Sequence, residues 1–203
     1  DVMEEEATED FEKMAAMHPS EKPYLKTGVF ELAKNRIVWL LVLMISSMLT
    51  GGILTRYEDA FKVMPLLVSF VPMLTDTGGN AGSQSSTMII RGMTIGEIAS
   101  SDILKVIWKE ARVSVIVGII LGAVNFIRLV AQYPGQPLVA LTVVLALFAT
   151  VFVAKVIGGM LPIAAKKLHL DPAIMAAPLI TTIVDAVSLV IYFQIAVELL
   201  HIK

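Results

Sequence analysis

Asp185 is the residue whose place in the sequence has the clearest chemical consequence, because it lies almost at the centre of the apolar run 172–197. An ionised carboxylate at the centre of a membrane helix costs roughly 2.5–3.5 kcal/mol even on lenient insertion scales, so such groups face a cavity or a partner. Its helical neighbours at i−4, i−3, i+3 and i+7 form one polar stripe: Thr181, Thr182, Ser188 and Tyr192. The stripe predicts an ion path at mid-membrane; the structural alternative is a protonated Asp185 that is hydrogen-bonded between helices.

A second polar element is the stretch 72–92, PMLTDTGGNAGSQSSTMIIRG, which lies between apolar runs. Gly78, Gly79 and Gly82 let backbone approach backbone or ligand closely. Side chains that offer oxygen atoms are Asn80, Ser83, Gln84, Ser85 and Ser86. Polar groups at membrane depth must be buried in protein or line water, so we expect this stretch to face a water-filled path and a close helix contact. A packing face of small residues alone is the competing interpretation.

The donor atoms in these two elements suit a hard cation. Carboxylate, hydroxyl, amide and carbonyl oxygens, without any cysteine, favour Mg²⁺, Ca²⁺ or Mn²⁺, and the three histidines lie outside the spans. A two-fold dimer would present two copies of Asp185 on its axis, and these would repel each other unless a cation lay between them. Because Mg²⁺ loses its water reluctantly, a pore with a few oxygen groups could hold the hydrated ion. The donor set does not rank Mg²⁺ against Mn²⁺, Co²⁺ or Ca²⁺.

The elements that position these residues are membrane helices. The chain has 203 residues, of which 56% are hydrophobic and 17% charged, and this excludes an ordinary soluble domain. Crossing a bilayer takes about 20 apolar residues. We therefore expect an all-α polytopic membrane protein with five transmembrane helices, at roughly 37–55, 63–90, 105–131, 137–165 and 172–200. The second of these contains Asp76 and the polar stretch.

Basic residues predict the orientation of the spans. One side is rich in them: Lys22, Lys26, Lys34, Arg36, Arg91, Lys105, Lys109, Arg112, Lys166 and Lys167. The other side has fewer: Arg56, Lys62, Arg128 and Lys203. By the positive-inside rule this multi-pass protein of the cell membrane has a cytoplasmic N-terminus and an external C-terminus.

Residues 1–20 form a separate element, before a transmembrane domain at 21–203. In the segment 1–17, DVMEEEATEDFEKMAAM, apolar residues recur with a helical period and acidic residues fill the remaining positions. We expect a short amphipathic helix that packs on protein or gathers cations, rather than one that binds an anionic lipid surface. Because the chain begins at Asp1 without an initiator methionine, it is expected to be a fragment of a longer protein.

Three motifs together resemble the MgtE magnesium channels: PMLTDTGGNAGSQSSTMIIRG, LDPAIMAAPLITTIVDAVSLVIYF and EEEATEDFEKM, which span essentially the whole chain. The resemblance implies a homodimer with five transmembrane helices per chain and a pore on the dimer axis, lined by the second and fifth helices. It also implies a hydrated Mg²⁺ at the paired Asp185 carboxylates, with auxiliary pore positions at Gly79, Ser83 and Thr181. Asp76 and Ser83 depart from relatives that have glycine and asparagine there.

The resemblance further implies a regulatory part. MgtE channels carry a soluble N-terminal domain and a pair of CBS domains, which this chain lacks, joined to the pore by an acidic plug helix. Residues 1–17 resemble that helix. Asp171 matches the position that shares Mg²⁺ with plug-helix acids, for which Glu5 and Glu6 are the candidates here.

The sequence therefore predicts the pore domain of a magnesium channel, with metal ligands at Asp185, Asp171, Glu5 and Glu6. The pore-lining candidates are Asp76, Gly79, Asn80, Ser83, Thr181, Thr182 and Ser188. The alternative is a magnesium exchanger coupled to Na⁺ or H⁺, in which Lys155 or Asp76 takes part; a Lys155–Asp185 ion pair would instead make that carboxylate structural. An enzyme is not expected because the spans contain no histidine, glutamate or cysteine beside Asp185, and no nucleic-acid partner is expected.

Overall fold

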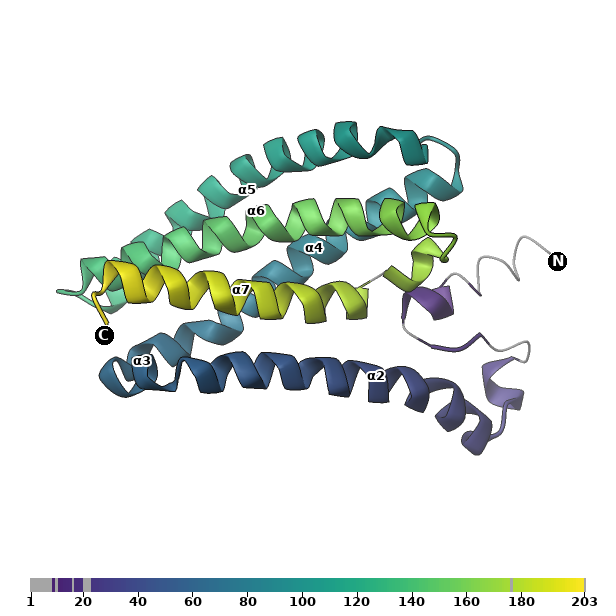
Figure 1. Ribbon diagram of the computed structural model, residues 1–203, viewed down its shortest axis with the longest axis horizontal. Coiled ribbons are helices and arrows are strands. Elements are labelled where there is room, and N and C mark those ends of the chain that lie inside the picture. Colours follow the sequence, from purple (N-terminus) through teal and green to yellow (C-terminus); the bar gives the residue numbers. More distant parts are fainter. Residues whose placement is uncertain (1–8, 10, 16, 20–22, 176, 203) are drawn as a thin grey trace.

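The computed structural model describes residues 9, 11–15, 17–19, 23–175 and 177–202, and the elements in these ranges are all helices (Figure 1). In chain order they are η1 (Tyr24–Lys26), α2 (Val29–Arg56), α3 (Glu58–Val63), η2 (Pro65–Phe70), α4 (Val71–Thr94), η3 (Ser100–Asp102), α5 (Ile103–Gln132), α6 (Pro137–Lys167), η4 (Pro172–Met175) and α7 (Ala177–Leu199). The expected all-α fold is confirmed for these residues.

Four of the long helices are long and apolar enough to cross a membrane. They are α2, α5, α6 and α7, whose most apolar windows have mean hydropathies of 2.3, 2.3, 2.6 and 1.9. Helix α4 has 24 residues, but its polar stretch keeps it outside this group. The four apolar spans of the sequence are thus helices of a membrane protein, whereas α4 is a long helix of mixed character.

The chain before α4 differs from the expected span 63–90. The helix begins only at Val71, because the chain turns out of helical geometry at Met64 (φ −138°, ψ 82°) and then enters the short helix η2 at Pro65. Proline disfavours helical geometry in the residue before it and cannot continue a helix. Pro72 lies in the first turn of α4, where a missing N–H costs nothing. The helix then continues to Thr94.

Helix α6 is the centre of the bundle. It contacts α4, α5 and α7, while α4 runs diagonally beneath α6 and α7 (Figure 1). The α4–α6 crossing is a backbone contact, since a Cβ atom on Gly158 would overlap the carbonyl group of Gly82. A Cβ on Gly82 would in turn lie 2.7 Å from Cγ2 of Ile180 and 3.2 Å from the Ala154 carbonyl oxygen. The glycines of α4 therefore serve the close helix contact that the sequence predicts.

Helix α2 is the least packed of the long helices. None of its most apolar window is buried within the chain, and among the long helices it contacts α7. Its C-terminal end makes that contact through Ile53 and Leu54, and Tyr57 stacks on Phe193 with ring centroids 5.0 Å apart. The remaining apolar surface of α2 is free for lipid or for another protein chain.

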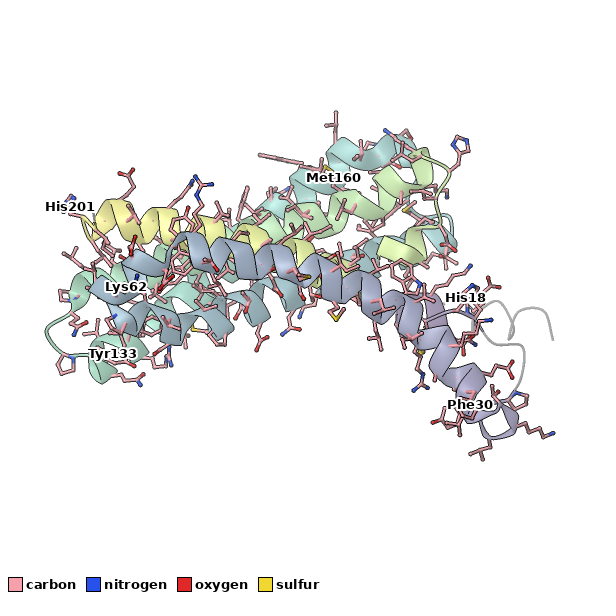
Figure 2. All side chains as sticks on the ribbon, turned by 60° about the horizontal axis from the view of Figure 1, so that its bottom comes forward. His18, Phe30, Lys62, Tyr133, Met160 and His201 are labelled. Carbon is pink, nitrogen blue, oxygen red and sulfur yellow. The ribbon has the colours of Figure 1, made fainter. Side chains whose placement is uncertain are left out.

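The histidines lie at or beyond the ends of the long helices. Figure 2 shows His18 and Phe30 at one end and His201, Lys62 and Tyr133 at the other. The third histidine, His169, lies two residues after the last residue of α6 and has φ 61°. All three histidines therefore lie outside the long helices, as the sequence predicts.

Tyr192 ties α7 to the segment before α4. Its side chain is fully buried, and its hydroxyl donates a hydrogen bond of 2.8 Å to the carbonyl oxygen of Leu67, which is also fully buried. We expect Tyr192→Phe to lower the free energy of unfolding by about 1–3 kcal/mol, because the buried carbonyl would lose its donor. Thermal unfolding of the purified protein measures this loss.

Tyr133→Phe is the matched control for that measurement. The Tyr133 ring packs edge-on against Phe70 at 5.9 Å, and no hydrogen bond joins its hydroxyl to another described residue. We expect this variant to melt like the unaltered protein. Equal melting temperatures of the two variants would show that the Tyr192 hydroxyl contributes nothing.

Candidate metal site and ion path

Helices α4 and α7 run antiparallel and meet along a line of glycines, called here the α4–α7 seam. A Cβ on Gly79 would lie 2.9 Å from Cγ2 of Thr181, and a Cβ on Gly78 would lie 2.9 Å from Cγ1 of Val184 and 3.0 Å from Oγ of Ser188. The order of these contacts shows that residues earlier in α4 face residues later in α7. Only glycine allows the two backbones to approach this closely.

Asp185 lies beside this seam, one helical turn beyond Thr181. Its side chain is half-buried, and no ion pair joins it to any described residue. Asp76 on α4 is exposed and acts electrostatically on the Asp185 carboxylate. Two negative groups from different helices thus lie near each other without a basic partner.

The other candidates on α4 share one face of that helix. Asp76, Gly79, Asn80 and Ser83 follow each other at i, i+3, i+4 and i+7, and this face is called here the α4 stripe. Asn80 is exposed and Gly79 is buried in the seam. Oγ of Ser83 is shielded from solvent and has no hydrogen-bond partner among the described residues. The stripe therefore runs along the edge of the seam and carries an oxygen atom without a partner.

The polar stripe expected on α7 divides into two parts. The hydroxyls of Thr181 and Thr182 both donate to the carbonyl oxygen of Pro178, at 2.9 and 3.0 Å. Ser188 is 1% exposed and lies in the seam against Gly78, and the buried Tyr192 donates its hydroxyl hydrogen bond to the carbonyl oxygen of Leu67. Thr181, Thr182 and Asp185 remain partly accessible within one chain.

A buried polar network lies behind α4. Lys155 is 5% exposed, and its ammonium donates to Oγ of Ser85 at 3.5 Å; this hydroxyl donates to Oε2 of Glu110 at 2.6 Å. Lys155 thus contacts Ser85, and no ion pair joins it to Asp185. The expectation that the spans hold no glutamate is wrong, because Glu110 and Glu198 already lie within the expected spans 105–131 and 172–200, and α5 places Glu110 in the bundle. A buried lysine needs a charged partner. A search of the sequence for a partner of Lys155 could therefore have found Glu110.

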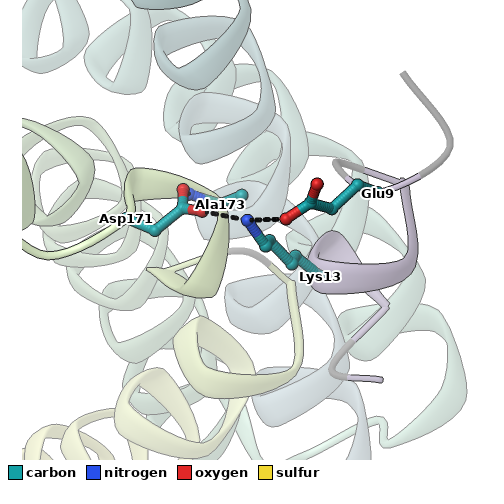
Figure 3. Close-up of polar contacts among 4 residues, drawn as sticks. All are labelled: Glu9, Lys13, Asp171 and Ala173. Atoms are coloured by element: carbon teal, nitrogen blue, oxygen red, sulfur yellow. Dashed lines mark hydrogen bonds and ion pairs between the residues drawn. The ribbon is translucent and has the colours of Figure 1, made fainter. Parts of the chain in front are cut away.

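Before the N-terminal end of α7, the N-terminal segment of the chain contacts Asp171 through Lys13 (Figure 3). The Lys13 ammonium lies 2.7 Å from Oδ2 of Asp171 and 2.6 Å from Oε1 of Glu9, and the Ala173 N–H donates to Oδ1 of Asp171 at 2.9 Å. Residues 11–14 are helical, as expected of the segment. Glu5 and Glu6 lie outside the described residues.

The pKa shifts at this contact follow from its geometry. Burial alone would raise the pKa of Asp171, but the hydrogen bonds from Lys13 and from the Ala173 N–H outweigh it and hold this pKa below its ordinary value of 3.8. The hydrogen bonds to Asp171 and Glu9 raise the pKa of Lys13 above its ordinary value of 10.5. Lys13 therefore neutralises Asp171 in this arrangement.

A family model described as MgtE, divalent cation transporter, matches residues 71–195. The chain belongs to the MgtE family. The matched residues include the α4–α7 seam, Asp76, Asp171 and Asp185, and they exclude the segment that carries Lys13.

Curated relatives in the MgtE family match nearly the whole chain. A protein of Bacillus subtilis is 35% identical over 202 residues, and one of Thermus thermophilus is 36% identical over 202 residues. A third, from Enterococcus faecalis, is 29% identical over 196 residues. All three are named magnesium transporter MgtE, and the matches cover 97–99% of this chain but only 42–44% of the relatives. The chain thus spans less than half the length of these MgtE proteins.

We expect Lys13→Met to release the N-terminal segment of this MgtE-family chain from Asp171. The lost stabilisation is about 1 kcal/mol, because both side chains reach solvent and screening weakens the pair. Hydrogen exchange in residues 11–19 should become faster. Lys34→Met, a neutralisation on the exposed surface of α2, should leave that exchange unchanged, and unchanged exchange in Lys13→Met would contradict the docking role.

The same contact predicts how docking depends on pH. A depressed aspartate pKa gives stabilisation that is present above 3.8 and lost as pH falls through the lower pKa of the docked state. A raised lysine pKa gives stabilisation that is present below 10.5 and lost as pH rises through the higher pKa. The stability of the docked segment should therefore not change between pH 3.8 and pH 10.5. In Lys13→Met, the loss of docking at acid pH should disappear.

Proposed function

We propose that this chain is the membrane part of a magnesium transporter that works as a channel, with a hydrated Mg²⁺ held at Asp185. The observation that carries the proposal is an accessible carboxylate without an ion-pair partner among the described residues, beside a glycine seam between helices α4 and α7. Membership of the MgtE family and the names of the three relatives support Mg²⁺ as the cargo. The chain's own chemistry also admits Mn²⁺, Co²⁺ and Ca²⁺.

In this proposal α4 is the fifth transmembrane helix. Its 24 residues extend roughly 36 Å at 1.5 Å per residue, which is enough to cross the hydrocarbon core. Its contacts with α6 and α7 bury glycines and serines, so its polar groups are shielded from lipid. An odd number of crossings agrees with Figure 1, where the described N-terminal segment and the C-terminus lie at opposite ends. The basic residues then make the N-terminal side cytoplasmic.

We also propose that the pore forms between two copies of the chain. Within one chain, no group of three or more His, Asp or Glu side chains among the described residues is arranged to hold a metal ion. A two-fold dimer would bring two copies of Asp185 to its axis and so complete the donor set. The exposed Asp76 and Asn80 would then line the path together with Gly79, Ser83 and Thr181. The free apolar surface of α2 is available for the same association.

Residues 1–20 would act as a plug at the cytoplasmic side. The docked part contacts Asp171, in the loop that leads into α7 and towards Asp185. High cytoplasmic Mg²⁺ would bridge Asp171 to acids such as Glu5 and Glu6, since clustered carboxylates repel when empty and are drawn together by a divalent ion. The longer MgtE relatives leave room for the N-terminal and CBS domains that would control this segment.

The second candidate is an exchanger that couples Mg²⁺ to Na⁺ or H⁺. It is favoured by Asp76, an additional titratable group at the candidate path. Mg²⁺ uptake into liposomes at a set membrane voltage separates the two mechanisms. Uptake that follows voltage alone supports a channel, uptake that requires a Na⁺ or proton gradient supports the exchanger, and uptake no faster than in protein-free liposomes contradicts both.

A further inference from the structure

Asp76 and Asp185 lie at the same level of the α4–α7 seam. The two helices touch at Gly79 and Thr181, where a Cβ on the glycine would lie 2.9 Å from the threonine methyl group. Asp76 precedes Gly79 by three residues, about 4.5 Å along α4, and Asp185 follows Thr181 by four residues, about 6 Å along α7. Because the helices are antiparallel, both displacements go towards the same end of the bundle. The two carboxylates therefore flank one level of the candidate path, and Asp76 acts electrostatically on Asp185.

No basic side chain of the described residues neutralises this pair. Lys155 is engaged by Ser85, which lies nine residues beyond Asp76 and so roughly 13 Å farther along α4. Arg128 reaches α4 from α5, but its Nε donates to Oδ1 of Asn125 at 3.0 Å and its guanidinium contacts Sδ of Met73 at 3.6 Å. Two like charges without a counter-charge are unfavourable at membrane depth unless a cation lies beside them.

The α4 stripe also offers neutral oxygen atoms. Oγ of Ser83, two turns from Asp76 on the α4 stripe, is shielded from solvent and has no hydrogen-bond partner among the described residues. Asn80 is exposed on the same face. A buried polar atom without a protein partner indicates a bound water or ion along this stripe.

We infer that Asp76 is a second ion-binding carboxylate, so that each chain contributes Asp76 together with Asp185 to the divalent cation in the path. The inference rests on the proposed function. Asp76 raises the affinity of the site for divalent cations and its selectivity for divalent over monovalent cations. Two carboxylates per chain place more negative charge around the ion than Asp185 alone. More negative charge around the ion strengthens the binding of divalent cations more than that of Na⁺ or K⁺.

Asp76→Asn tests this inference in protein reconstituted into lipid nanodiscs, with calorimetric titration of MgCl₂ and of MnCl₂. We expect the dissociation constant for each ion to rise about tenfold or more, because affinity follows the charge count of the ligands. In liposomes, Na⁺ should compete with Mg²⁺ more strongly than in the unaltered protein. Asp76→Glu keeps the charge and should keep most of the affinity, and Asp76→Ser repeats the neutralisation if the asparagine variant does not fold.

Asp59→Asn is the matched control. Asp59 lies in α3 with its side chain 89% exposed and paired with Lys62, so its neutralisation changes the net charge equally but far from the seam. We expect it to bind both ions like the unaltered protein. If Asp76→Asn and Asp59→Asn have the same affinities while Asp185→Asn loses binding, the inference is wrong and the proposed function stands. If Asp185→Asn also binds and transports normally, both are wrong.

Discussion

Asp185→Asn is expected to reduce Mg²⁺ uptake into liposomes by at least about a hundredfold. Asparagine has nearly the same shape and keeps one oxygen, but it removes the negative charge at the α4–α7 seam. Removal of one partner from a charge pair in a low-dielectric site costs about 3–5 kcal/mol, which corresponds to more than a hundredfold in occupancy. A Mg²⁺ ion at this depth would then have lost its main electrostatic stabilisation.

The measurement compares this variant with Glu198→Gln under one set voltage. Glu198 lies near the C-terminal end of the same helix and is exposed, so its neutralisation should leave uptake unchanged. Size-exclusion profiles must first show that both variants keep the assembly of the unaltered protein. Normal uptake by Asp185→Asn would mean that the carboxylate is structural and that the ion passes elsewhere.

Gly158→Ala is expected to be the most damaging single-methyl change in the bundle. The added Cβ would overlap the backbone of Gly82, and a backbone carbonyl cannot turn away as the end of a flexible side chain can. Overpacking of this kind costs about 3 kcal/mol or more, against a gain of about 1 kcal/mol in helix propensity. We therefore expect a large fall in melting temperature and, because Gly82 belongs to the seam, a loss of ion binding at Asp185.

Gly122→Ala provides the comparison, because it places the same methyl group in the interior of α5. That Cβ would lie 3.2 Å from Cγ1 of Val144, a side-chain methyl that can give way by a few tenths of an ångström. Thermal unfolding of the two variants should differ by several degrees. Equal stabilities would show that the α4–α6 crossing relaxes without cost.

The sequence was sufficient for the features that depend on single segments. The four apolar helices follow from run length, and Asp185 is a candidate site residue because one acid interrupts a long apolar run. The resemblance to MgtE, confirmed by the family match, came from motifs that are continuous in the chain. The start of α4 was misplaced because Pro65 and Pro72 lie in an apolar stretch whose composition alone continues the span.

Features that depend on the register between helices could not be predicted. The Lys155–Ser85–Glu110 network joins residues 70 and 25 positions apart, and no local pattern relates them. Asp76 and Asp185 lie at the same level because of the place where α4 and α7 meet. That place is the contact between Gly79 and Thr181. The contact of Lys13 with Asp171 was not expected from the sequence, whereas the expected contact of Asp171 with Glu5 and Glu6 stays a prediction. The dimer, its pore and the regulatory domains remain predictions.

The contact between Lys13 and Asp171 also bears on biosynthesis. The two residues are 158 positions apart, and all of α2, α4, α5 and α6 lie between them. At 5–20 residues per second, a ribosome needs roughly 8–32 s to pass from one to the other. During that time the N-terminal segment has no Asp171 to bind, so it must stay undocked while the helices enter the membrane. Docking of this segment is thus among the last steps in the maturation of the protein.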